Sequence, residues 1–143
     1  MLKALLLLSA FLPLQEVPAK REVAIQLLNG KSGKPLTGQR ILIFGGSTPE
    51  EAGFHETHFE VKTDATGLAR ITFDPKQTQF IEVFVDFMTV CDTKGNKPTF
   101  DVKAIVETGF AESNTCGSAK AKLQPGRLVV FARSPTLREK MAW

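Results

Sequence analysis

Two clusters of turn-forming residues constrain what this chain can fold into. The first is Gly30-Lys31-Ser32-Gly33-Lys34-Pro35, and the second is Thr63-Asp64-Ala65-Thr66-Gly67. Gly33 and Gly67 can adopt the positive φ that tight turns need, and Pro35 fixes its own φ. Asp64 can accept hydrogen bonds from amides later in its turn. The sequence therefore predicts that strands reverse direction at both places.

The segments between such turns alternate apolar and polar residues, which is the pattern of half-buried strands. In one of them Val23, Ile25 and Leu27 share a face, and in another Phe87 shares a face with Ile81. Strands are predicted at seven places: Glu22–Leu28, Arg40–Phe44, His58–Thr63, Leu68–Phe73, Phe80–Val90, Phe100–Glu107 and Arg127–Arg133. This arrangement predicts a single all-β domain, a seven-stranded β-sandwich over residues 20–133. Residues 134–143 are predicted to form a short helix or to fray.

The first nineteen residues have the plan of a secretory signal peptide. Lys3 gives a positive start, an apolar run follows from Ala4 to Leu14, and small residues precede a cleavage site near Ala19. The run is too short to span a bilayer. An uncleaved anchor and a buried first strand are the alternatives. We expect an exported protein, periplasmic or secreted, with no transmembrane segment in the mature chain.

Cys91 and Cys116 are the only cysteines in the sequence. They do not form a Cys-x-x-Cys pair, and an exported protein meets an oxidising environment. We therefore predict one disulfide between them. Two buried free thiols are the alternative, whereas the wide spacing argues against a redox-active pair.

The two turn clusters also carry a resemblance. Gly30 to Gln39, followed by Thr63-Asp64-Ala65-Thr66-Gly67-Leu68-Ala69, resembles the carboxypeptidase regulatory-like, or prealbumin (transthyretin)-like, superfamily of β-sandwiches. The match covers roughly Glu22 to Phe73. The resemblance implies an Ig/prealbumin-like sandwich and says little about function, because this fold hosts many roles.

Two activities found in that superfamily are not predicted for this chain. The transthyretin-like hydroxyisourate hydrolases use a motif that begins with Tyr, and this sequence has no Tyr. The collagen-adhesin stalk domains form a Lys–Asn cross-link, and the last predicted strand, Arg127–Arg133, contains no Asn. We therefore expect a non-enzymatic member of the superfamily, stabilised by the predicted disulfide.

His55 and His58 are the only histidines, and acidic residues surround them. Two ring nitrogens and a carboxylate can hold zinc, but residues three apart on a strand point to opposite sides. A metal-assisted hydrolase is therefore kept only as an alternative. Gly45-Gly46 follows a strand without the further glycines and Lys of a phosphate-binding loop. No cofactor is predicted.

Binding to a partner is the kind of function that the remaining sequence features indicate. Phe54 and Phe110 lie in connecting segments where an exposed ring can anchor a partner, and Lys94 and Lys97 lie in a polar loop. From Asp92 onward there are nine basic and five acidic residues, a mildly basic region. We expect a non-catalytic module that binds protein or glycan at the cell envelope, and not nucleic acid. Assembly through an exposed strand edge is the alternative.

Overall fold

The computed structural model describes residues 20–54, 57–92 and 99–142. The predicted leader, residues 1–19, therefore lies outside the described residues. Within the described ranges there are nine strands: β1 (Arg21–Asn29), β2 (Arg40–Gly46), β3 (Thr57–Lys62), β4 (Leu68–Phe73), β5 (Phe80–Val85), β6 (Thr89–Val90), β7 (Thr99–Asp101), β8 (Phe110–Ala111) and β9 (Arg127–Arg133). The same ranges hold three short helices: α1 (Pro49–Gly53), α2 (Val102–Thr108) and α3 (Leu137–Lys140).

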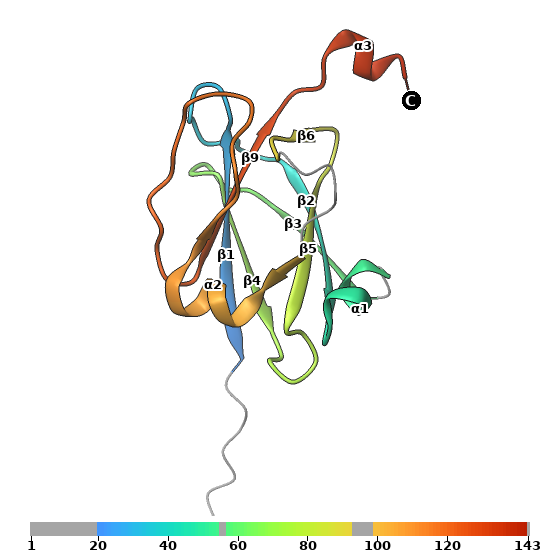
Figure 1. The fold of residues 1–143 in the computed structure, drawn as a ribbon, viewed down its shortest axis with the longest axis vertical. Coiled ribbons are helices and arrows are strands. Elements are labelled where there is room, and N and C mark those ends of the chain that lie inside the picture. The colour runs from blue at the N-terminus through green and yellow to red at the C-terminus, as the bar shows by residue number, and fades with distance from the viewer. Residues whose placement is uncertain (1–19, 55–56, 93–98, 143) are drawn as a thin grey trace, which may run out of the picture.

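The strands form two sheets that share one apolar core (Figure 1). The first sheet has the order β4-β1-β9-β6, and β8 also pairs with β9. The second has the order β3-β2-β5-β7. The β1–β9 and β8–β9 pairs are parallel, and the others are antiparallel. The prediction of a strand-rich domain is confirmed, although the count of seven strands differs from the nine in the described ranges.

The core is built from alternate residues of both sheets. Val23, Ile25 and Leu27 of β1 are fully buried, and they face Ile41 and Ile43 of β2 across the same cluster. Burying one such side chain stabilises a fold by about 1.5–3 kcal/mol. The alternation read from the sequence was therefore correct for these strands.

The second turn cluster makes a hairpin between β3 and β4. The Asp64 carboxylate accepts hydrogen bonds from the amides of Thr66, at 2.8 Å, and Leu68, at 3.0 Å. These bonds, with one from the Thr66 hydroxyl first among them, hold the pKa of Asp64 below its usual value. Gly67 has φ 76° and Gly33, in the first cluster, has φ 71°. Pro35, also in the first cluster, forms an isolated bridge with Leu28.

The strand predicted over Phe100–Glu107 is wrong after its first two residues. β7 ends at Asp101, whose side chain accepts a hydrogen bond from the Lys103 amide and caps α2. Val102 and Ile105 are buried, three residues apart, which is helical spacing. β-Branched side chains such as these favour strands, but here the Asp101 cap and the contacts of Val102 and Ile105 with the core stabilise a helix instead.

The single strand predicted over Phe80–Val90 is also wrong. β5 ends at Val85, and β6 begins at Thr89 in the other sheet. Between them the Met88 amide donates to the Val85 carbonyl at 3.4 Å, and Phe87 has φ 55°. The chain turns there, so the Phe87 ring is 88% exposed and does not share the buried face of Ile81.

The last residues of the chain form α3, which extends beyond the end of the sheets (Figure 1). Thr136 and Glu139 make a reciprocal capping box at its start. The Arg133 guanidinium donates two hydrogen bonds to the Glu139 carboxylate, of 2.9 and 2.7 Å. α3 buries none of its residues, so local contacts alone support it. No helix in the described part of the chain is long and apolar enough to cross a membrane.

Candidate functional site

The predicted disulfide is confirmed. Cys91 and Cys116 are bonded, with their Cα atoms 5.4 Å apart. Cys91 is buried beside Val129 and Phe131 of β9, in a small cluster separate from the main core. The Asn114 side chain donates to the carbonyl of Gly30, at 2.8 Å, and thereby fixes the Cys116 segment to the turn after β1. This pair has a structural role.

The structure does not bring the two histidines into a metal site. His58 is exposed on β3, with its ring 6.4 Å from the ring of Phe44, and His55 lies outside the described residues. In the part of the chain that the structure describes, no three His, Cys, Asp or Glu side chains are grouped to hold a metal ion. The alternative of a metal-assisted hydrolase therefore gains no support from the described residues.

The predicted contact residues lie on different elements. Phe54 follows α1 and is 71% exposed. Phe110 is on β8, 44% exposed, with its ring 5.5 Å from that of Phe100. Lys94 and Lys97 lie outside the described residues. The exposed rings of Phe54 and Phe110 lie on different elements, and within the described residues they do not form one surface.

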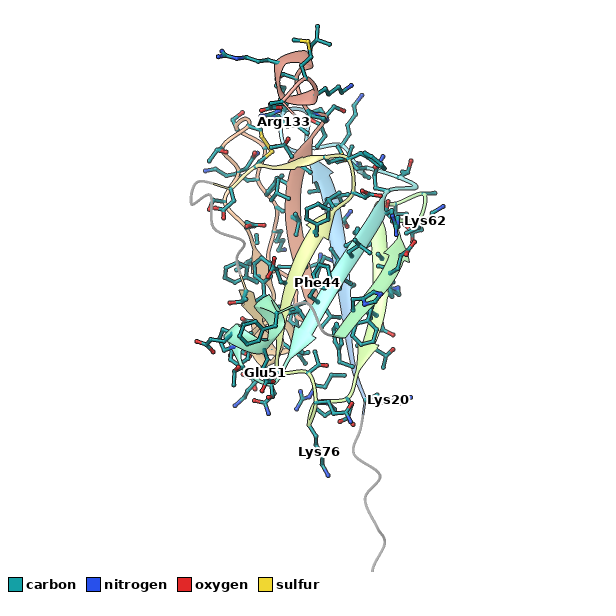
Figure 2. All side chains as sticks on the ribbon, turned by 90° about the vertical axis from the view of Figure 1, so that its right-hand side faces the viewer. Lys20, Phe44, Glu51, Lys62, Lys76 and Arg133 are labelled. Atoms are coloured by element: carbon teal, nitrogen blue, oxygen red, sulfur yellow. A yellow bond between two sulfur atoms is a disulfide. The ribbon has the colours of Figure 1, made fainter. Side chains whose placement is uncertain are left out.

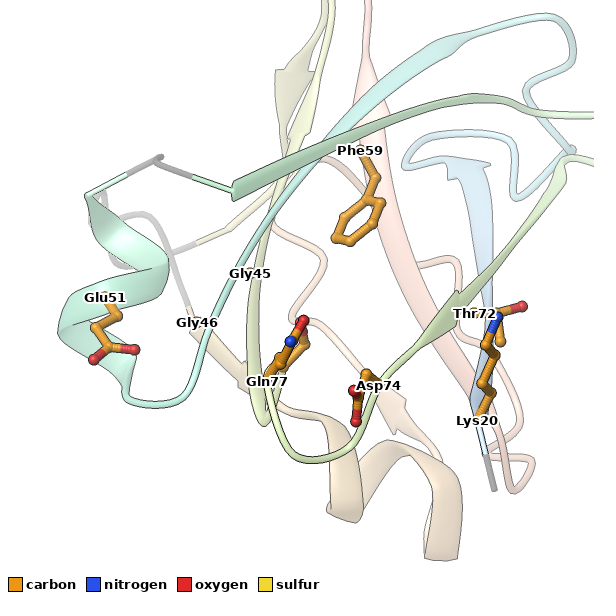
Figure 3. A pocket seen from close by; sticks show the side chains of 9 residues that line it. Lys20, Gly45, Gly46, Glu51, Phe59, Thr72, Asp74 and Gln77 are labelled. Atoms are coloured by element: carbon orange, nitrogen blue, oxygen red, sulfur yellow. The ribbon is translucent and has the colours of Figure 1, made fainter. Parts of the chain in front are cut away.

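A cleft of about 420 Å³ opens at one end of the two sheets, which we call the cleft end (Figure 3). One wall comes from the start of β1 and the end of β4, and the other from the end of β2 and from α1. The half-buried ring of Phe59 lies between these walls. The lining residues are Lys20, Gly45, Gly46, Glu51, Phe59, Thr72, Asp74, Gln77 and Thr78.

Gly46 allows the second wall of the cleft to be closely packed. A Cβ atom at Gly46 would lie 2.5 Å from the Ala52 nitrogen, so α1 packs directly on the backbone of β2. The Glu51 carboxylate accepts a hydrogen bond from the Ser47 amide at 2.9 Å. Bonds from the hydroxyl and amide of Ser47 hold the pKa of Glu51 below its usual value. Glu51 therefore stays ionised and anchors α1 beside the cleft.

Polar groups on the other side of the cleft have free hydrogen-bonding capacity. Asp74 accepts a bond from the Lys76 amide at 2.9 Å, which fixes the loop that carries Gln77. Among the described residues, the Lys20 ammonium and the Gln77 amide have no hydrogen-bond partner. Figure 3 shows both side chains at the cleft, with Phe59 above Gln77. The cleft thus combines the unengaged Lys20 and Gln77 donors with carboxylate acceptors and an aromatic ring.

Gly46→Ala is expected to disturb the cleft end by pushing α1 outward. The added methyl group meets backbone and Cβ atoms, which cannot rotate away. We expect thermal or urea unfolding to show a loss of about 1–2 kcal/mol, as for other overpacked sites. Gly53→Ala is the matched control, because a Cβ at Gly53 meets nothing within 4 Å. A Gly46→Ala protein as stable as this control would contradict the close packing.

Sequence reasoning missed this cleft. Its signal along the chain is the Gly45-Gly46 pair after a strand, a pattern that is typical of an ordinary turn and does not indicate a cleft. Lys20, Thr72 and Gln77 come from segments that only the pairing of β1 with β4 and the return to β5 bring together. No spacing pattern in the sequence indicates that Lys20, Thr72 and Gln77 lie close together.

Comparison of the chain with protein-family models gave no match, and comparison with the sequences of curated proteins gave none either.

Proposed function

We propose that this protein is an exported, non-catalytic β-sandwich module that binds a glycan in the cleft beside α1. The cleft itself carries the proposal. It offers the unengaged amide of Gln77 and ammonium of Lys20 beside the Phe59 ring, in an opening of about 420 Å³. Sugars present hydroxyl groups and apolar ring faces together, so they suit such a mixed lining.

The proposed architecture is a prealbumin-like or carboxypeptidase regulatory-like sandwich. Two sheets on a shared core, with tight turns at Gly33 and Gly67, support it. The Cys91–Cys116 disulfide supports export, because structural disulfides persist mainly in oxidising compartments. Cleavage near Ala19 would leave Lys20, a residue of the cleft, at the start of the mature chain.

A non-catalytic role is supported by the engagement of the acidic groups at the cleft. Glu51 bonds Ser47 and Asp74 bonds the Lys76 amide, so both carboxylates already serve local structure. A general acid or base must instead reach the reacting group of the substrate. We propose that these carboxylates shape the cleft and that Lys20 and Gln77 contact the ligand.

A protein ligand and assembly through a strand edge are the other proposals. β3 is an edge strand of its sheet and exposes His58, Glu60 and Lys62. Charged side chains on an edge strand are a common protection against pairing with another chain. This observation favours a ligand in the cleft over edge-to-edge assembly.

The test is an equilibrium titration with a panel of soluble neutral and acidic oligosaccharides. We expect Lys20→Ala and Gln77→Ala each to weaken binding of the best ligand by about tenfold, as the loss of one hydrogen bond at a binding site does. Lys76→Ala is the matched control, because Lys76 belongs to the same loop and does not line the cleft. Binding that is equally strong in all four proteins, or no binding to any sugar, would contradict the proposal.

A further inference from the structure

Exposed apolar side chains gather at the end of the molecule opposite the cleft. Phe87 is 88% exposed, Leu137 is 75% exposed and Met141 is 73% exposed. Phe87 lies in the turn between β5 and β6, and α3 extends from the same end (Figure 1). Figure 2 shows this end around Arg133, far from Lys20 and Lys76 at the cleft end. Three apolar side chains so exposed at one end of the molecule make that end a candidate interaction surface.

Phe87 has an unfavourable backbone conformation. Its φ of 55° is the left-handed region, and it is the one residue other than glycine with positive φ in the described chain. Glycine adopts this conformation without strain, whereas a bulky residue does not. The exposed ring gains no burial in return. Folding of a single chain therefore does not explain a phenylalanine at this position, and such outliers are typical of functional sites.

The residue that precedes Phe87 is fixed to the neighbouring sheet. The Arg40 guanidinium donates to the Asp86 carboxylate at 3.0 Å, and the Asp86 amide donates to the Arg40 carbonyl at 3.0 Å. Arg40 also bonds Glu60 on β3 at 2.6 Å. Asp86, just before Phe87, is thus tied to β2 directly and to β3 through Arg40. The backbone next to Phe87 is therefore already ordered, so it loses little conformational freedom on binding.

A recess of about 440 Å³ lies at the same end of the molecule. Its lining residues are Asn29, Lys31, Cys116, Arg133, Ser134 and Thr136. Lys31 and Arg133 are basic, and with Glu139, the partner of Arg133, they sum to one positive charge. Arg40, Glu60 and Asp86 at the Phe87 turn sum to one negative charge. The turn and the recess are therefore complementary in charge.

We propose that two copies of this chain associate end to end, with Phe87 of each copy inserted into the recess of the other. A twofold dimer requires both complementary features on one patch of one chain, and this end carries both. The exposed Leu137 and Met141 would be partly covered by the same contact. The two clefts would remain open at the far ends, so a dimer would bind repeated ligands with increased avidity.

A membrane surface is the alternative partner for the Phe87 end, and the structure favours it less than a second copy of the chain. Phe87, Leu137 and Met141 are three single side chains on two separate segments, and so small an apolar contact gives weak membrane binding by itself. Arg40, Glu60 and Asp86 together leave one negative charge at the Phe87 turn, which anionic lipid repels. A second copy instead offers basic groups around an opening large enough for the ring.

Sedimentation equilibrium of the purified protein, from low micromolar to near millimolar concentration, tests the proposal. We expect a reversible monomer–dimer equilibrium. Phe87→Gly should weaken dimerisation by about thirtyfold or more, as for a central aromatic contact. It should not lower the melting temperature measured at a concentration where both proteins are monomeric, because glycine relieves the strained φ. Lys31→Glu should also weaken the dimer.

Phe54→Gly is the matched control, since Phe54 is nearly as exposed but follows α1. It should leave the dimer unchanged. A protein that stays monomeric throughout, or a dimer that survives Phe87→Gly, overturns the proposal. So does binding of monomeric protein to vesicles of anionic phospholipid that depends on Phe87. None of these readouts involves a sugar, so they are independent of the glycan proposal.

Discussion

Reduction of the Cys91–Cys116 disulfide is expected to lower the free energy of unfolding by about 3–4 kcal/mol. The bond closes a loop with a sequence separation of 25 residues, and the chain-entropy account of such a loop gives this magnitude. The loss is a large part of the stability of a domain of this size, which is typically about 5–15 kcal/mol. Urea unfolding with and without a reducing agent measures the difference directly.

Replacing both cysteines separates the bond from the side chains around it. A Cys91→Ala/Cys116→Ala protein should lose at least as much stability as the reduced protein, because Cys91 is buried against Val129 and Phe131. This double variant should not respond to a reducing agent. If the reduced protein unfolds at the same urea concentration as the oxidised one, the proposed structural role of the bond is wrong.

Glu112→Gln is expected to stabilise the protein by about 2–3 kcal/mol at pH 8 and to have little effect at pH 5. Burial, followed by the negative charge of Asp92, raises the pKa of Glu112 from 4.5 to about 7. Glu112 is 7% exposed, and among the described residues its Oε1 atom has no hydrogen-bond partner. Ionising it in this place is therefore costly, and Gln imitates the protonated form.

The direction of the pH dependence follows from the raised pKa. The folded state holds the proton more tightly than the unfolded state, so Glu112 contributes stability that is complete below about pH 4.5 and is lost as the pH rises through about 7. Each pKa unit corresponds to about 1.4 kcal/mol, which sets the size of the effect.

Urea unfolding of both proteins from pH 5 to pH 8 tests this account. The difference between the wild-type protein and Glu112→Gln should grow across that interval. Glu107→Gln is the control, because the Glu107 side chain is 56% exposed and should give a small, nearly constant difference. A Glu112→Gln protein that is less stable than the wild type at pH 8 would show that an ionised carboxylate is favourable there.

Turn chemistry and strand periodicity could be read from the sequence because both are local. Asp64 bonds amides two and four residues later, and Gly67 supplies the positive φ of the same turn. Val23 and Ile25 are buried because alternate residues of a strand share a face. The disulfide was found because the sequence has only two cysteines.

The features that were not predicted depend on distant contacts. The burial of Glu112 arises where β6 and β8 meet beside β9, with Cys91 and Glu112 both bonded to that strand. α2 replaced a predicted strand because the core accepts Val102 and Ile105 at helical spacing. The cleft joins segments from both sheets, so it exists only once the chain is folded. Local patterns contain none of this information.

Chemical-shift mapping tests most directly whether ligand binds at the cleft end. Titration of the isotope-labelled protein with the best-binding oligosaccharide should move the amide signals of Gly45, Gly46 and Thr78, and the side-chain amide signal of Gln77. The signals of Lys31 and Phe87, at the other end, should stay in place at a fixed protein concentration. Shifts confined to the Phe87 end, or spread evenly over both ends, would contradict the account.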